Sequence, residues 1–85
     1  MSTYNIMGII IDHRTKSAPK VQEVLTSHGC KIGLRVGMHE AQDACSEEGL
    51  VILQVNGDSA EIGKLEEDLN RIDGVVTKSM SITSN

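Results

Sequence analysis

Two stretches of the chain are apolar at nearly every position. Residues 6–11 read Ile-Met-Gly-Ile-Ile-Ile, and residues 49–57 read Gly-Leu-Val-Ile-Leu-Gln-Val-Asn-Gly. Each run is too short for a buried helix and is rich in β-branched side chains, so each predicts a strand with apolar residues on both faces. We therefore expect these two segments to form the centre of a sheet.

Two other stretches alternate between apolar and polar or glycine positions. In residues 30–38 the apolar set is Cys30, Ile32, Leu34, Val36 and Met38; in residues 76–82 it is Val76, Met80 and Ile82, with Lys78 in the same register. Strict alternation predicts strands with one wet or partner-facing side, which is typical of a sheet edge. We expect Arg35 to lie on the outward side of the first of these strands.

Two amphipathic helices are predicted between the strands. In the first, Ser17 is the expected N-cap and Pro19 fits the first turn. Its apolar stripe is formed by Val21, Val24, Leu25 and His28, and Gly29 ends it. In the second, Asp58 and Glu61 have the spacing of a capping box. Its stripe is formed by Ile62, Leu65, Leu69 and Ile72, and Gly74 ends it.

The resulting order is β-α-β-β-α-β in a single domain over residues 1–85, which predicts an α+β, ferredoxin-like sandwich. We expect an antiparallel sheet of order 4-1-3-2 with both helices on one face. The other face would then expose about three to five aliphatic side chains of the central strands, a large apolar patch for a monomer. This predicts a homodimer or homotetramer, formed through that face or through an edge strand.

Composition narrows the classes of function. The 85 residues include one Tyr and no Trp or Phe, and the net charge is −4. The lack of stacking aromatics and of positive charge argues against direct nucleic-acid binding. Two cysteines are too few for a disulfide framework, and no apolar run reaches the roughly 20 residues of a membrane span. We expect a cytoplasmic protein, and the absence of known catalytic motifs predicts that it is not an enzyme.

Several of these segments together resemble a known family. They are residues 8–14 (Gly-Ile-Ile-Ile-Asp-His-Arg), 33–38 (Gly-Leu-Arg-Val-Gly-Met), 49–57 and 72–75 (Ile-Asp-Gly-Val). From about residue 5 to residue 82 the chain is similar to the iron-only hydrogenase system regulators, which are ACT-like domains similar in fold to the C-terminal domain of the nickel-responsive repressor. The resemblance implies an oligomeric transcriptional or hydrogenase-system regulator that binds a small ligand or metal. The repressor's ribbon-helix-helix segment has no counterpart here, so any action on DNA would require a partner.

The resemblance to ACT domains places a small effector at the turn after the first strand, at a subunit interface. That turn precedes a helix N-terminus, which attracts anions, and it carries several positive charges. The candidate effector residues are Asp12, His13, Arg14, Lys16, Ser17 and Arg35. Arg35 is a candidate ligand clamp or oligomer contact, because the glycines on either side of it let another chain approach. The alternatives are a solvated turn and an ordinary charge on an edge strand.

A metal-responsive module is a second hypothesis. His39 and Cys45 have five residues between them, as do a His and a Cys of the nickel repressor. Two ligands do not complete a square-planar nickel site, which needs four donors; in a dimer the second subunit could add His28 or His13. The sequence names no cofactor. A third hypothesis is a structural oligomerisation domain that binds no ligand.

Overall fold

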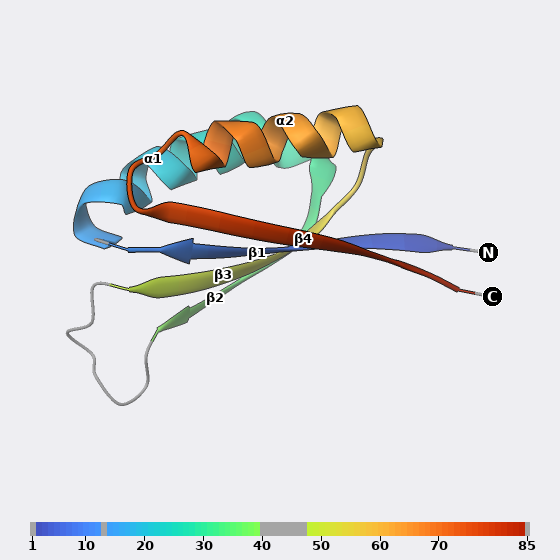
Figure 1. Cartoon of the computed structure of the whole chain (residues 1–85), viewed down its shortest axis with the longest axis horizontal. Coiled ribbons are helices and arrows are strands. Elements are labelled where there is room, and N and C mark those ends of the chain that lie inside the picture. Colours follow the sequence, from blue (N-terminus) through green and yellow to red (C-terminus); the bar gives the residue numbers. More distant parts are fainter. Residues whose placement is uncertain (1, 13, 40–47, 85) are drawn as a thin grey trace.

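The computed structural model describes residues 2–12, 14–39 and 48–84 (Figure 1). An antiparallel sheet of four strands carries two helices on one face. Its elements are β1 (Thr3–Ile11), α1 (Arg14–Ser27), the short 3₁₀ turn η1 (Gly29–Lys31), β2 (Ile32–His39), β3 (Gly49–Val55), α2 (Ser59–Asn70) and β4 (Val75–Thr83). The strand order β2-β3-β1-β4 confirms the predicted ferredoxin-like topology.

The hydrophobic core lies between the helices and the sheet face that they cover. Its members are Met7, Ile9, Ile11, Val21, Leu25, Val51, Leu53, Val55, Leu65, Leu69 and Val75. They come from alternate positions of β1 and β3, from the predicted apolar stripes of both helices and, with Val75, from the start of β4. The two central strands are therefore placed as predicted, and their side chains of opposite parity point to the uncovered face of the sheet.

The second helix begins as predicted. Asp58 accepts a hydrogen bond from the Glu61 backbone N–H at 2.8 Å, and Glu61 accepts one from the Asp58 N–H at 3.2 Å. This reciprocal capping box satisfies two of the N–H groups that a helix start leaves free.

The first helix begins earlier than predicted, at Arg14, so the prediction of Ser17 as its N-cap was wrong. Ser17 is 6 % exposed, and its hydroxyl donates to the Asp73 carbonyl at 2.9 Å. Pro19 lies inside the helix, one turn further in than predicted. A tertiary contact explains the difference, because the Ser17 hydroxyl forms a hydrogen bond with the turn after α2 and does not cap its own helix.

The edge strand β2 faces the opposite way from the sequence-based prediction, which placed Arg35 on the outward side. Leu34 and Val36 of β2 point to the uncovered face, whereas Arg35 lies on the helix side, opposite Leu53. A register shift between Ile32 and Leu34 separates Ile32, which packs against the core, from the two aliphatic residues that follow. Because sidedness follows register, one extra residue reverses every later side chain of the strand.

Candidate functional site

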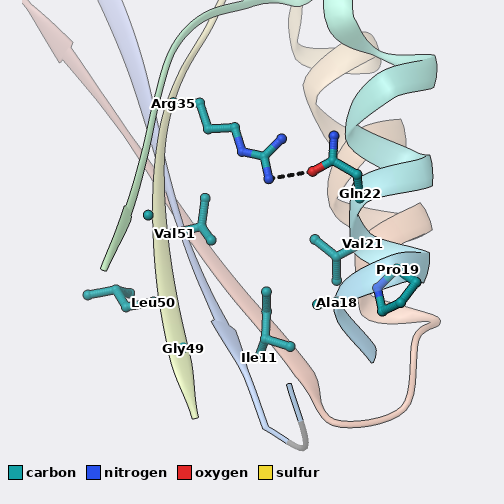
Figure 2. A pocket seen from close by; sticks show the side chains of 10 residues that line it. Ile11, Ala18, Pro19, Val21, Gln22, Arg35, Gly49, Leu50 and Val51 are labelled. Carbon is teal, nitrogen blue, oxygen red and sulfur yellow. Dashed lines mark hydrogen bonds between the residues drawn. The ribbon is translucent and has the colours of Figure 1, made fainter. Parts of the chain in front are cut away.

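A groove of about 430 Å³ lies between α1 and the ends of β2 and β3 (Figure 2). It is lined by Ile11, Ala18, Pro19, Val21, Gln22, Arg35, Gly37, Gly49, Leu50 and Val51. Five of these ten residues carry apolar side chains on the groove side of the sheet, Leu50 points its side chain to the other face (Figure 2), and two are glycines. The groove thus offers an apolar surface with two polar side chains, a composition typical of small-molecule sites.

Those two polar side chains meet across the groove. Arg35 Nη2 donates a hydrogen bond of 2.6 Å to Gln22 Oε1, which joins β2 to α1 (Figure 2). A guanidinium has five N–H donors, and this bond uses one of them. The bond therefore orients Arg35 while leaving donors that suit a carboxylate or phosphate.

Glycines keep the groove open. A Cβ placed on Gly37 would meet no atom within 4 Å, so a side chain at this position would extend into open space. Gly37 lies opposite Val51, and Gly49 lies opposite Ile11, in both cases on the helix side of the sheet. A larger residue at position 37 would occupy the groove without disturbing the strand.

The predicted effector residues are only partly brought together. Arg35 lines the groove, but on the covered side of the sheet instead of the outward side. Asp12 and Ser17 instead connect the junction of β1 and α1 to the turn after α2. The Asp12 N–H donates to the Gly74 carbonyl at 2.7 Å, and the Ser17 hydroxyl donates to the Asp73 carbonyl. Lys16 is exposed in the first turns of α1, Arg14 begins that helix, and His13 lies outside the described residues. The predicted position at a subunit interface stays a prediction.

The described part of the structure does not contain both predicted metal ligands. His39 is the last residue of β2, opposite Gly49, and Cys45 lies outside the described residues. Within residues 2–12, 14–39 and 48–84 no group of three His, Cys, Asp or Glu side chains could hold a metal ion. The metal hypothesis therefore stays a prediction.

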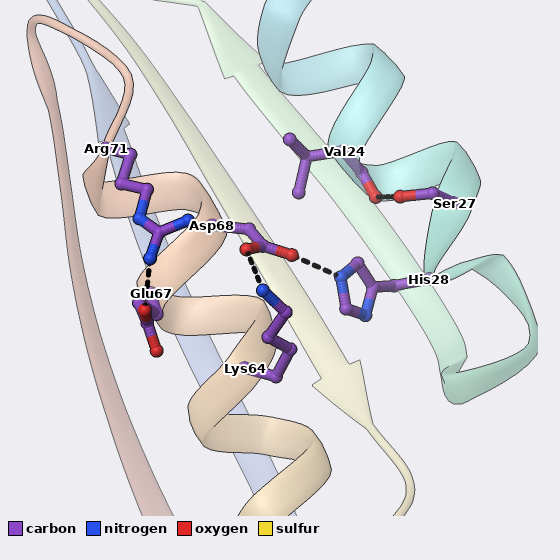
Figure 3. A network of polar contacts seen from close by, with 7 residues as sticks. All are labelled: Val24, Ser27, His28, Lys64, Glu67, Asp68 and Arg71. Carbon is purple, nitrogen blue, oxygen red and sulfur yellow. Dashed lines mark hydrogen bonds and ion pairs between the residues drawn. The ribbon is translucent and has the colours of Figure 1, made fainter.

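A polar cluster joins the two helices away from the groove (Figure 3). Asp68 accepts hydrogen bonds from Lys64 at 2.9 Å and from His28 at 3.0 Å. Both bonds lower the pKa of the Asp68 carboxyl, and the bond from Lys64 has the larger effect. Nearby, Lys31 lies 2.6 Å from Glu61; this contact lowers the pKa of Glu61 and raises that of Lys31. The cluster stabilises the packing of α1 and η1 on α2.

Gln22 was missed by sequence reasoning. It lies on the polar side of a predicted helix, where the pattern gives it no distinguishing feature. The one available signal was its position directly after Val21, a residue of the apolar stripe, which places it at the border of the covered face.

The family match covers most of the chain. Residues 3–79 match the family described as "TM1266-like: Iron-only hydrogenase system regulator, putative". The chain belongs to this family. The predicted family resemblance is thereby confirmed, and with it the ACT-like, ferredoxin-like class of fold.

Solved structures agree with the family assignment. The protein TM1266 of Thermotoga maritima is 26 % identical, with a TM-score of 0.84 over 96 % of this chain and all of that one. PA3566 of Pseudomonas aeruginosa is 13 % identical, with a TM-score of 0.63 over 99 % and 98 % of the two chains. A formyltetrahydrofolate deformylase of Pseudomonas putida is 12 % identical, with a TM-score of 0.57 over 93 % of this chain and 28 % of that one, and both of these share the fold alone.

Two further comparisons gave negative findings. No curated protein matches the chain. In the part of the chain that the structure describes, neither helix is long and apolar enough to cross a membrane.

Proposed function

We propose that this member of the regulator family is a ligand-sensing domain whose groove binds a small aliphatic carboxylate. The observation that carries the proposal is the position of Arg35. Its guanidinium lies at an apolar groove, held by Gln22 and bordered by Gly37. An anionic head would pair with the guanidinium, and an aliphatic tail would displace water from the apolar lining.

The residues of the groove also suggest how a ligand would act on the protein. Ala18, Pro19 and Val21 belong to α1, whereas Gly37 and Val51 belong to the sheet. A ligand in the groove would contact both layers at once and favour the arrangement in which they are closest. A regulator works in this way, because a ligand shifts an equilibrium between states that bind it with different affinity.

Isothermal titration calorimetry with butyrate, isovalerate and the branched-chain L-amino acids, each added separately, tests the proposal. We expect binding by at least one of them. Arg35→Gln removes the charge and should weaken that binding by about 10- to 150-fold, which corresponds to the roughly 1.5–3 kcal/mol of a hydrogen bond to a charged group. Gly37→Val should abolish it by filling the groove.

Arg71→Gln is the matched control. Arg71 is likewise an exposed arginine with a short side-chain contact, 2.5 Å to Glu67, but it is the C-cap of α2, away from the groove. It should leave the affinity unchanged. If no probe binds, or if Arg35→Gln and Arg71→Gln weaken binding equally, the proposed function is wrong.

A further inference from the structure

The sheet face opposite the helices, which no other element covers in the cartoon of Figure 1, carries exposed apolar side chains from all four strands. We call it the open face. Its most exposed large side chains are 43–61 % accessible: Tyr4, Ile10, Leu34, Val36, Val76, Met80 and Ile82. Ile6, Leu50 and Ile52 lie among them and are partly buried. The patch is thus larger than the central strands alone would make it, because both edge strands turn their aliphatic sides the same way.

Strand register makes this patch continuous. Tyr4 lies opposite Ile82, and Ile10 lies opposite Val76 on one side and Leu50 on the other. Val36 lies opposite Ile52. Residues opposite each other in neighbouring strands share a face, so these apolar pairs lie together on the open face, where Gln54, Gly8 and Lys78 interrupt them.

The open face carries little charge. Among the described strand residues that face this side, Lys78 is the one with a charged side chain, and a lysine can extend its ammonium group to the rim of a contact. Helix α2, with its acidic residues Glu61, Glu66, Glu67 and Asp68, is on the opposite side of the sheet. Two copies of this acidic chain can therefore meet through the open face with their acidic helices far apart.

We propose that the open face is the interface of a homodimer in which the sheets of two copies pack face to face. The seven residues present on the order of 600 Å² of surface, close to the roughly 800 Å² per partner of a standard stable interface and at the upper limit for a monomer's largest patch. A two-fold axis needs only one self-complementary surface, and a largely apolar sheet face whose one charged side chain, Lys78, comes from an edge strand provides it. The two sheets would enclose a second core, as in a β-sandwich.

Met80 and Ser81 offer a matched pair of variants to test the dimer. They are consecutive exposed residues of β4, but Met80 lies opposite Ile6 on the open face, whereas Ser81 lies opposite Asn5 on the helix side. Met80→Lys and Ser81→Lys add the same charge to the same strand. By analytical ultracentrifugation, we expect a dimer for the wild type and for Ser81→Lys. Met80→Lys should raise the dimer dissociation constant on the order of 100-fold or more, because symmetry places two new charges in the interface.

A monomeric wild type at micromolar concentration would overturn the proposal, as would a dimer equally tight in both variants. Circular dichroism reports whether the variants fold. If Met80→Lys does not fold, the wild type decides: a soluble paramagnetic agent should leave the methyl signals of Ile10, Val76 and Ile82 sharp in a dimer, and broadened methyls would refute it. The groove lies on the other side of the sheet, so Arg35→Gln should leave the dimer intact, and failure of one proposal leaves the other standing.

Discussion

Gly63 is the position at which one added methyl group should stabilise the protein. It lies within α2 and is exposed, and a Cβ placed there would meet no atom within 4 Å. Glycine in an exposed helix interior costs about 0.8–1.0 kcal/mol relative to alanine, because the unfolded chain loses more freedom on folding. Gly63→Ala should therefore raise the free energy of unfolding by about 1 kcal/mol.

The same substitution at Gly74 should have the opposite sign. Gly74 has φ +80°, a backbone conformation that side chains disfavour, and its Cβ would lie 3.1 Å from the Asp12 carbonyl oxygen. The Asp12 N–H also donates to the Gly74 carbonyl at 2.7 Å, so this backbone has little room to shift. A left-handed conformation costs a residue with a Cβ about 1–2 kcal/mol, and we expect a loss of at least that size.

Urea and thermal unfolding, followed by circular dichroism at one fixed protein concentration, measure both effects. For a domain of this size, 1 kcal/mol corresponds to roughly 4–8 °C in Tm. Gly63→Ala should melt higher by about that amount, and Gly74→Ala should melt lower. If Gly63→Ala brings no gain, or if Gly74→Ala is stabilising, the reasoning from backbone conformation and local space is wrong.

Three further predictions concern stability. Leu69 is fully buried, so Leu69→Ala should lower the free energy of unfolding by about 2–5 kcal/mol in urea titrations. Ser17→Ala removes a buried hydroxyl bond and should cost about 1 kcal/mol, whereas Ser27→Ala removes an exposed bond of the same 2.9 Å and should cost less than about 0.5 kcal/mol; equal losses would contradict the role of Ser17. The pKa of Asp68 is lowered in the folded state, so its contribution is present above the unfolded pKa of about 3.9 and is lost as pH falls through the folded pKa. Asp68→Asn should therefore flatten the acid limb of a stability–pH profile, and an unchanged limb would refute the assignment.

The fold could be predicted because local pattern and global topology agree. Apolar runs marked β1 and β3, helical stripes marked α1 and α2, and the Asp58–Glu61 spacing marked the start of α2. Each of these signals depends on residues close in sequence. The connection order then left few arrangements compatible with right-handed crossovers.

The sidedness of the edge strands could not be predicted in the same way. Alternation shows that β2 and β4 have an apolar side but does not say which way it points, and the shift at Ile32–Leu34 is set by pairing with β3. The groove depends on this detail, since Arg35 reaches Gln22 only from the helix side. Ser17 likewise has a partner, Asp73, that is 56 residues away in sequence.

The central claim is that the groove beside Arg35 is a ligand site, and NMR titration of the ¹⁵N-labelled protein tests it most directly. Isovalerate and the branched-chain L-amino acids would be added one at a time while the backbone amide signals are followed. We predict saturable shifts for at least one probe, concentrated at Gly37, Gly49 and Gln22 and reduced in Arg35→Gln. Spectra that no probe changes, or shifts that Arg35→Gln leaves unaltered, would contradict the claim.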